Sequence, residues 1–304
     1  MSMSDLSQQA EDVFGTTLVA MVTPFTADGQ VDADSAQKLG THLVDSGVNG
    51  LVVTGTTGEI STLTDDENVL MYQVVKEAVG DRCKIIAGTG MNDTAHSAEL
   101  SRRAAATGVD GLLLVTPYYN KPVQAGIKAH FETVASATDV PVILYDIPGR
   151  SVRPIAAETI VALADHPNIL ALKDAKGDYQ STTTILAETD LFVYSGDDLM
   201  TFPLMAAGAV GVISVSAHIA PGTYRAMVDA LNEGDLLTAR ALHFQLDPVQ
   251  RAVMSHHQGA VASKAILAGQ GLISSPTVRL PLTEATEEDL KAIRTDLAET
   301  NISF

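Results

Sequence analysis

Short apolar segments recur along this chain at a nearly constant spacing. Four of them end at Gly88, Thr116, Tyr145 and Lys173, so that successive ends lie 28 or 29 residues apart. Helix-like segments separate them, and a steady strand–helix period of this size is typical of a (β/α)8 barrel. The sequence therefore predicts an α/β protein with a (β/α)8 TIM barrel. An open doubly wound sheet is the alternative, but no Gly-x-Gly-x-x-Gly turn follows the first segment.

Eight apolar segments qualify as strands, and none shows the polar–apolar alternation of a sheet with one exposed face. The predicted strands are 18–22, 50–54, 84–88, 111–116, 140–145, 168–173, 191–194 and 210–214. Beyond residue 219 the pattern is helical only, with predicted helices at 221–231, 234–246, 249–267 and 284–299. We expect a barrel over residues 1–233 that carries the active site. A C-terminal helical region, 234–304, is expected to pack on the barrel or on another subunit.

Composition excludes several classes of protein. A net charge of −18 argues against a nucleic acid or an anionic membrane as partner. No apolar run approaches the roughly 20 residues that span a bilayer, and no signal peptide is visible at the start of the chain. Cys83 is the only cysteine, which fits a reducing compartment and a cytoplasmic location. We interpret it as a structural thiol.

Chemically useful residues collect directly after the predicted strands. The segments are Gly55-Thr-Thr-Gly-Glu59, Thr116-Pro-Tyr-Tyr-Asn-Lys-Pro122, Tyr145-Asp-Ile-Pro-Gly-Arg150, Leu172-Lys-Asp-Ala-Lys-Gly177 and Ser195-Gly-Asp-Asp198. Because barrel enzymes build their sites at the carboxyl ends of the strands, we expect these segments to share one rim. They bring together an amine, phenols, an arginine and a turn rich in N–H and hydroxyl groups that suits a carboxylate.

Lys173 would stand at the carboxyl end of a buried strand. Loss of water around its ammonium would lower its pKa and make the amine a nucleophile. Taken alone, the residue has a second interpretation, in which its side chain extends to water and pairs with Asp174 or Asp178. The neighbouring motifs favour the nucleophile.

The five motifs, in this order, resemble those of the dihydrodipicolinate synthase family of pyruvate-dependent class I aldolases, and the likeness extends from about Leu18 to Leu282. The resemblance implies a lyase that condenses pyruvate with L-aspartate 4-semialdehyde through a Schiff base. This reaction makes 4-hydroxy-tetrahydrodipicolinate, the first committed step of diaminopimelate and lysine biosynthesis. One alternative is an aldolase for a sugar-derived 2-keto acid such as N-acetylneuraminate, although such enzymes lack an arginine matching Arg150. The other alternative is a silent barrel that only binds keto acids.

The resemblance implies four catalytic residues. Lys173 would form the Schiff base, and Tyr145 would transfer protons to and from it. Thr56 would connect Tyr145 to Tyr119 as a relay. In the family this second tyrosine reaches in from the neighbouring subunit, so at least a dimer is implied. Family members are usually dimers of dimers, and a homotetramer is expected here.

The resemblance also implies residues that bind the substrates. Thr57, together with the preceding threonine, would hold the pyruvate carboxylate, and Arg150 would bind the carboxylate of the semialdehyde. Gly196 and the carbonyl group of Ile213 would form the far wall. No cofactor and no metal are expected. Asp146 stands where many family members carry asparagine, a departure that we expect to leave activity intact.

A second departure concerns feedback control. Many bacterial members of the family bind lysine at the tight dimer interface, and Asn92 and Tyr118 match that pattern. Asp65, Asn68 and His96 replace the usual two histidines and a glutamate. Loss of the glutamate removes a counter-charge for the lysine ammonium, so the sequence predicts weak or absent inhibition by lysine.

Overall fold

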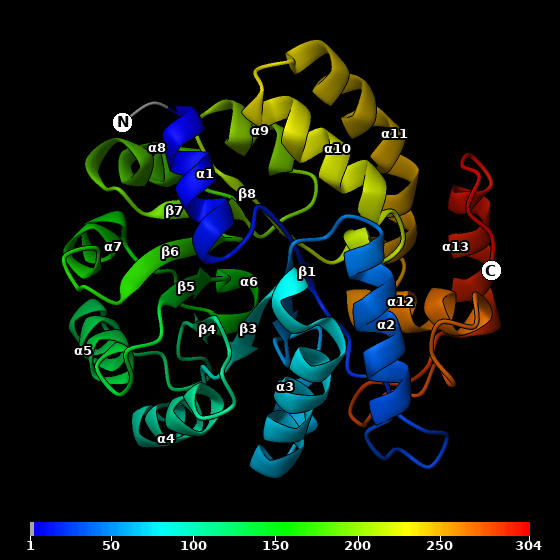
Figure 1. Cartoon of the computed structure of the whole chain (residues 1–304), viewed down its shortest axis with the longest axis horizontal. Helices are drawn as coiled ribbons and strands as arrows, with labels where there is room; N and C mark the ends of the chain where they lie inside the picture. Colours follow the sequence, from blue (N-terminus) through cyan, green and yellow to red (C-terminus); the bar gives the residue numbers. More distant parts are fainter. Residues whose placement is uncertain (1–2) are drawn as a thin grey trace.

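A closed barrel of eight parallel strands forms the centre of the computed structural model, which describes residues 3–304 (Figure 1). The strands are β1 (Thr17–Ala20), β2 (Gly50–Val53), β3 (Lys84–Gly88), β4 (Gly111–Val115), β5 (Val142–Asp146), β6 (Ile169–Asp174), β7 (Phe192–Ser195) and β8 (Gly211–Ser214). Each strand pairs with the next, and β1 also pairs with β8, which closes the sheet. The predicted (β/α)8 barrel is confirmed, and the predicted strand bounds differ from the observed ones by at most two residues.

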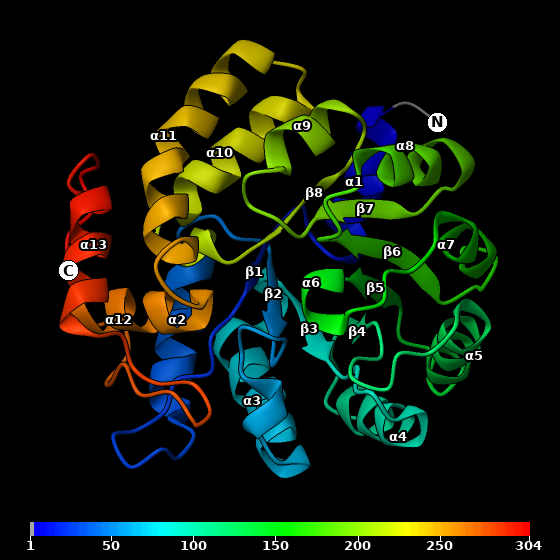
Figure 2. The same ribbon diagram turned by 180° about the vertical axis from the view of Figure 1, so that it is seen from behind.

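Helices surround the barrel (Figures 1 and 2). Those before and between the strands are α1 (Met3–Val13), α2 (Ala33–Asp45), α3 (Asp65–Val79), α4 (Thr94–Ala105), α5 (Gln124–Ala135), α6 (Pro148–Ser151), α7 (Ala157–Leu163), α8 (Tyr179–Glu188) and α9 (Thr201–Ala206). Three short 3-10 helices are η1 (Ile60–Thr62), η2 (Gly80–Arg82) and η3 (Ser216–His218). After β8 come α10 (Pro221–Asn232), α11 (Leu236–Met254), α12 (Gly259–Gly269) and α13 (Glu287–Leu297). Within residues 3–304, no helix is both long and apolar enough to cross a membrane.

Two apolar clusters explain why the strand segments show no polar–apolar alternation. Successive side chains along a strand point to opposite faces of the sheet. One set fills the barrel interior and includes Leu18, Val52, Ile86, Leu113, Ile143, Ala171, Phe192 and Ile213. The alternate set packs against the surrounding helices and includes Val19, Leu51, Ile85, Leu112, Leu144, Leu172, Val193 and Val212. Because both faces of every strand are buried, both sets have to be apolar.

Helix α1 closes the amino-terminal end of the barrel. Its Ala10, together with Phe14 just beyond the helix, belongs to the interior cluster, and the Phe14 ring meets the edge of Phe192 at a centroid distance of 6.4 Å. The Tyr194 hydroxyl donates to the carbonyl of Gly15 at 2.7 Å, which fixes the chain as it leaves the helix. No element was predicted for this segment. The helix therefore adds a bottom layer to the predicted barrel.

The C-terminal helices differ from the prediction in one respect. The predicted helix at 249–267 is wrong, because α11 runs without interruption from Leu236 to Met254, through Pro248, and α12 begins only at Gly259. Pro248 removes one backbone donor, yet it is buried, as are Val249 and Ala252 after it, so packing maintains the helix. These helices pack against α10 and η3 of the same chain. A domain boundary at residue 233 remains a prediction.

We expect truncation of Phe14 to destabilise the fold. Phe14 is fully buried, and replacing it by alanine leaves a cavity, so Phe14→Ala should lower the free energy of unfolding by about 3–5 kcal/mol. Phe244→Ala is the matched control, because that ring is 67% exposed and its loss should change the value by no more than about 0.5 kcal/mol. Denaturant unfolding of the two variants, followed by circular dichroism, measures both. If both variants lower the free energy of unfolding equally, the packing of Phe14 at the amino-terminal end of the barrel does not stabilise the fold.

Candidate active site

Lys173 lies beside Tyr145 at the carboxyl end of the barrel. The two residues are paired in the register of β5 and β6, and each is two residues beyond an interior side chain, Ile143 or Ala171. Both therefore face the barrel interior. The Nζ atom of Lys173 is 4.2 Å from the centroid of the Tyr145 ring, and the lysine is only 4% exposed. The interpretation in which this lysine extends to water is wrong.

Burial gives both groups unusual pKa values. Loss of water lowers the pKa of Lys173 to about 8; the Asp198 carboxylate opposes this shift and the Arg150 guanidinium adds to it. About a tenth of the amine is therefore neutral at pH 7, far more than for a lysine in water, and the neutral amine is the nucleophile. Burial raises the pKa of Tyr145 to about 12, against smaller opposing effects of Arg150 and of the Thr56 hydroxyl. Its phenol stays protonated and can donate.

The turn after β2 places its hydroxyl groups at the same rim. The Thr56 hydroxyl lowers the pKa of Tyr145 and therefore lies near its phenol, and Thr57 is buried. Gly58 is required by the tightness of the turn, because a Cβ atom there would lie 2.7 Å from the Cα of Thr54. The structure thus brings Thr56 and Tyr145 together as predicted.

The remaining predicted binding residues occupy different depths. Arg150 is exposed on α6, the short helix that lies at the rim in Figure 2. Gly196 lies against Lys173, since a Cβ atom at this glycine would approach the lysine Cγ to 3.0 Å. Ile213 is buried on β8 and paired in register with Leu18, so it faces the interior. All three lie at or just beyond the carboxyl end of a barrel strand.

Tyr119 is the one predicted catalytic residue that is not packed into this group. It follows β4 with a left-handed backbone (φ 73°), which is uncommon for a residue with a side chain, and its side chain is 87% exposed. A single chain therefore presents Tyr119 to the outside. A role for it in the neighbouring subunit's site remains a prediction.

A buried ion pair that was not predicted lies at the base of the Thr56–Thr57 turn. The ammonium of Lys264, on α12, lies 2.5 Å from a carboxylate oxygen of Glu59, and both side chains are almost completely buried. A signal was present, because Lys264 is the only charged residue of the otherwise apolar helix Gly259–Gly269. Such a lysine has to find a buried partner.

Asp146, the predicted departure from the family pattern, lies on the opposite face of β5 from Tyr145. One of its carboxylate oxygens accepts a hydrogen bond from the Ile155 backbone at 3.1 Å and lies 3.9 Å from the Lys176 ammonium. Burial raises its pKa to about 7. Its position behind the loop that carries Arg150 makes it a support for that loop, outside the group of reacting residues.

Cys83 behaves as a structural thiol. It is buried, and burial raises its pKa to about 12, so the nucleophilic thiolate is scarce at neutral pH. In the described part of the chain, no three histidine, cysteine, aspartate or glutamate side chains gather as they would around a metal ion. The expectation of metal-free chemistry stays a prediction.

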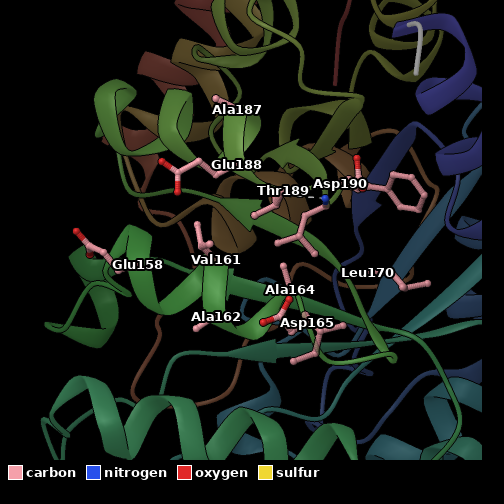
Figure 3. Close-up of a pocket in the computed structure, with 13 residues that line it drawn as sticks. Glu158, Val161, Ala162, Ala164, Asp165, Leu170, Ala187, Glu188, Thr189 and Asp190 are labelled. Carbon is pink, nitrogen blue, oxygen red and sulfur yellow. Dashed lines mark hydrogen bonds between the residues drawn. The ribbon is translucent and has the colours of Figure 1, made fainter.

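A hollow of about 640 Å³ lies at the other end of the barrel, between α7 and α8 and next to the first residues of β6 and β7 (Figure 3). The charged side chains that line it are Glu158, Asp165, Glu188 and Asp190. It contains none of the predicted site residues, and its acidic lining would repel a keto acid. The candidate active site is therefore the rim around Lys173.

Comparisons with known proteins agree with this geometry. Residues 13–300 match the model of the dihydrodipicolinate synthetase family. A 4-hydroxy-tetrahydrodipicolinate synthase of Kineococcus radiotolerans is 54% identical over 94% of this chain and 92% of its own length, and that of Mycolicibacterium paratuberculosis is 50% identical over 99% of each. The crystal structure of the Acinetobacter baumannii dihydrodipicolinate synthase complexed with pyruvate superposes with a TM-score of 0.91, at 37% identity, over 95% of this chain and 99% of that one.

The lowered pKa of Lys173 predicts how its reactivity depends on pH. The pKa of Lys173 is about 8, so the ammonium predominates when the pH is lower than that value. The rate of imine formation with a small 2-keto acid should therefore fall about tenfold for each pH unit well below the pKa, and it should level off at pH values above the pKa. The rate of imine formation is measured by quenching timed samples with excess borohydride and determining the mass of the protein by mass spectrometry. Lys173→Ala measures the background from other lysines. An apparent pKa near that of free lysine would contradict the burial argument.

Proposed function

The chain belongs to the dihydrodipicolinate synthetase family, and we propose that it condenses pyruvate with L-aspartate 4-semialdehyde to 4-hydroxy-tetrahydrodipicolinate. In this role it is a lyase of lysine and diaminopimelate biosynthesis. The observation that carries the proposal is Lys173, a buried amine with a pKa of about 8 that lies against the Tyr145 phenol at the carboxyl rim. This combination supports Schiff-base chemistry on a keto acid.

The first half of the reaction uses the amine and the phenol. The neutral amine of Lys173 attacks the keto carbon of pyruvate, and loss of water leaves an iminium that withdraws electrons from the neighbouring methyl group. Tyr145 mediates removal of a methyl proton to give an enamine. The Thr56 hydroxyl, which lowers the pKa of that phenol, continues the proton path.

The second half forms the new carbon–carbon bond. The enamine carbon attacks the aldehyde carbon of the semialdehyde, and the aldehyde oxygen takes up a proton. The amine of the semialdehyde then attacks the iminium carbon and displaces Lys173 as the ring closes. Thr57 holds the pyruvate carboxylate, Arg150 holds the carboxylate of the second substrate, and Gly196 and Ile213 form the far wall.

We propose that the active form is a homo-oligomer of at least two chains, in which Tyr119 completes the relay of its neighbour. The exposed side chain and left-handed backbone of Tyr119 support this role, because the relay needs a second phenol and this one is not packed into the group around its own Lys173. A dimer of dimers is the expected assembly. A cytoplasmic location agrees with the single buried thiol of Cys83.

Trapping of pyruvate tests the proposal directly. Pyruvate plus borohydride should add the mass of reduced pyruvate to Lys173 of the wild-type protein and add nothing to Lys173→Ala, which lacks the amine. The wild-type protein should also turn over pyruvate with L-aspartate 4-semialdehyde in a coupled assay. Tyr145→Phe should still form the imine but lose about 100-fold or more in turnover, since only the proton carrier is removed.

Comparison with a sugar-derived substrate separates the two aldolase hypotheses. If the protein cleaves N-acetylneuraminate and does not turn over the semialdehyde, the proposed reaction is wrong and the alternative aldolase reaction is supported. If pyruvate does not label Lys173, both aldolase hypotheses are excluded, and the hypothesis of a catalytically inactive barrel that only binds keto acids remains.

Two of the three residues that depart from the family's effector pattern, Asp65 and His96, are already paired with each other in this chain. His96 Nε2 lies 2.9 Å from a carboxylate oxygen of Asp65, whose second oxygen lies 3.8 Å from the Arg103 guanidinium. Asn68 is buried and uncharged. The Asp65 carboxylate is thus engaged by two basic groups and is a poor counter-charge for a free ammonium.

We therefore expect L-lysine to inhibit weakly or not at all. Initial rates in the coupled assay over a range of added lysine give the inhibition constant, and a sub-millimolar value would contradict the prediction. The same lysine concentrations, tested with the coupling enzyme alone, control for effects on the assay.

A further inference from the structure

The pair of Lys264 and Glu59 joins the C-terminal helical region to the turn that holds the pyruvate carboxylate in the proposed reaction. Lys264 belongs to α12, and Glu59 is the last residue of the Gly55-Thr-Thr-Gly-Glu59 motif. Both charges are withdrawn from water, with exposures of 0% and 1% for the side chains. An ion pair of this kind persists in a fold only when every polar atom is satisfied.

The surroundings of the pair meet this condition. The Lys264 ammonium donates to Glu59 at 2.5 Å and to the carbonyl of Thr277 at 2.9 Å, and it lies 4.0 Å from the centroid of the Phe25 ring. An aromatic face is a favourable neighbour for a cation. The second oxygen of Glu59 accepts from the Arg279 backbone N–H at 2.9 Å. The carboxylate is therefore fixed in position by two groups of the C-terminal region.

Fixing Glu59 also fixes the turn. Its backbone is left-handed (φ 57°), a conformation that is strained for glutamate. Its N–H donates to the carbonyl of Thr56 at 3.1 Å, and the next N–H, of Ile60, donates to Gly55 at 3.4 Å, which closes the turn. Thr57 lies between these points. The anchored side chain holds the residue in the conformation that closes the turn around both threonines.

We propose that Lys264 is a positioning residue for the reaction: by holding the Glu59 carboxylate, it keeps the Thr56–Thr57 turn in the geometry that receives the carboxylate of pyruvate. This inference rests on the proposed function, because it takes that turn to be the pyruvate carboxylate site. It gives the C-terminal helices a role in substrate binding.

The C-terminal segment has other attachments to the barrel, so loss of Lys264 need not undock it. The Arg279 guanidinium donates to the carbonyls of Gly29 and Thr62 and forms an ion pair with Glu67. Lys38 reaches the carbonyl of Gly271 on the same segment. Substitution of Lys264 should therefore release Glu59 while the segment stays attached.

The test compares Lys264→Met with Lys38→Met, a control that removes another lysine contact of the C-terminal segment. Lys264→Met should raise the KM for pyruvate about tenfold, the effect of losing one hydrogen bond to a charged group, and leave the KM for the semialdehyde within about twofold. The kcat at saturating pyruvate should fall by less than about threefold, since the reacting groups are unchanged. Lys38→Met should match the wild-type protein in all three values.

Glu59→Gln provides a second measurement on the same contact. It removes the charge but keeps an oxygen that can accept from the Arg279 backbone, and it should raise the KM for pyruvate in the same direction. The double variant Glu59→Gln/Lys264→Met should be no worse than the more affected single variant, because both substitutions act through one contact. Effects that multiply would mean that the two residues act independently, and would overturn the inference.

The outcomes separate this inference from the function beneath it. Wild-type protein that does not trap pyruvate on Lys173 refutes the proposed function. A second outcome refutes the inference alone. If the wild-type protein traps pyruvate, and Lys264→Met loses thermal stability but keeps the wild-type KM for pyruvate, then the ion pair only stabilises the fold. If Lys264→Met does not fold, Glu59→Gln decides by the same pyruvate KM.

Discussion

Closure of the eight-stranded parallel sheet is the constraint from which the chemistry of this chain follows. A closed barrel has no free edge, and it buries alternate side chains of each strand in its interior. Ala171 fills one interior position of β6, and the next interior position, at the carboxyl end, is Lys173. An amine at that position has little water around it. The largest cause of its lowered pKa is thus burial, which follows from where the strand ends.

Most of the barrel could be predicted from the sequence, because a strand buried on both faces leaves a local signal in the form of a continuous apolar run. Helix α1 left a local signal that the prediction missed, because Leu6, Ala10 and Val13 recur at helical spacing and form its packed face. Its place at the bottom of the barrel, by contrast, depends on a contact between distant residues, Phe14 and Phe192. The continuity of α11 through Pro248 depends on a buried face shared with the neighbouring helices, and the sequence alone favours a break at a proline.

The candidate site shows the same division. Lys173, Tyr145 and Thr56 could be placed together because each follows a strand, and all strands of a parallel barrel end at one rim. The support of the site could not be predicted in this way. Glu59 and Lys264 are 205 residues apart, and the sequence around either residue does not indicate that the other is its partner. Only the apolar character of the helix around Lys264 indicates that this lysine needs a buried partner.

The charges around the rim serve two purposes at once. The chain as a whole carries a net charge of −18, so an anionic substrate has to be attracted locally. Arg150 provides such an attraction, and its positive charge also contributes, after burial, to the lowered pKa of Lys173. A carboxylate bound at Arg150 would cancel that contribution and favour the ammonium. A single charge at Arg150 therefore acts on the rim in two ways, because it attracts an anion and disfavours the ammonium form of Lys173.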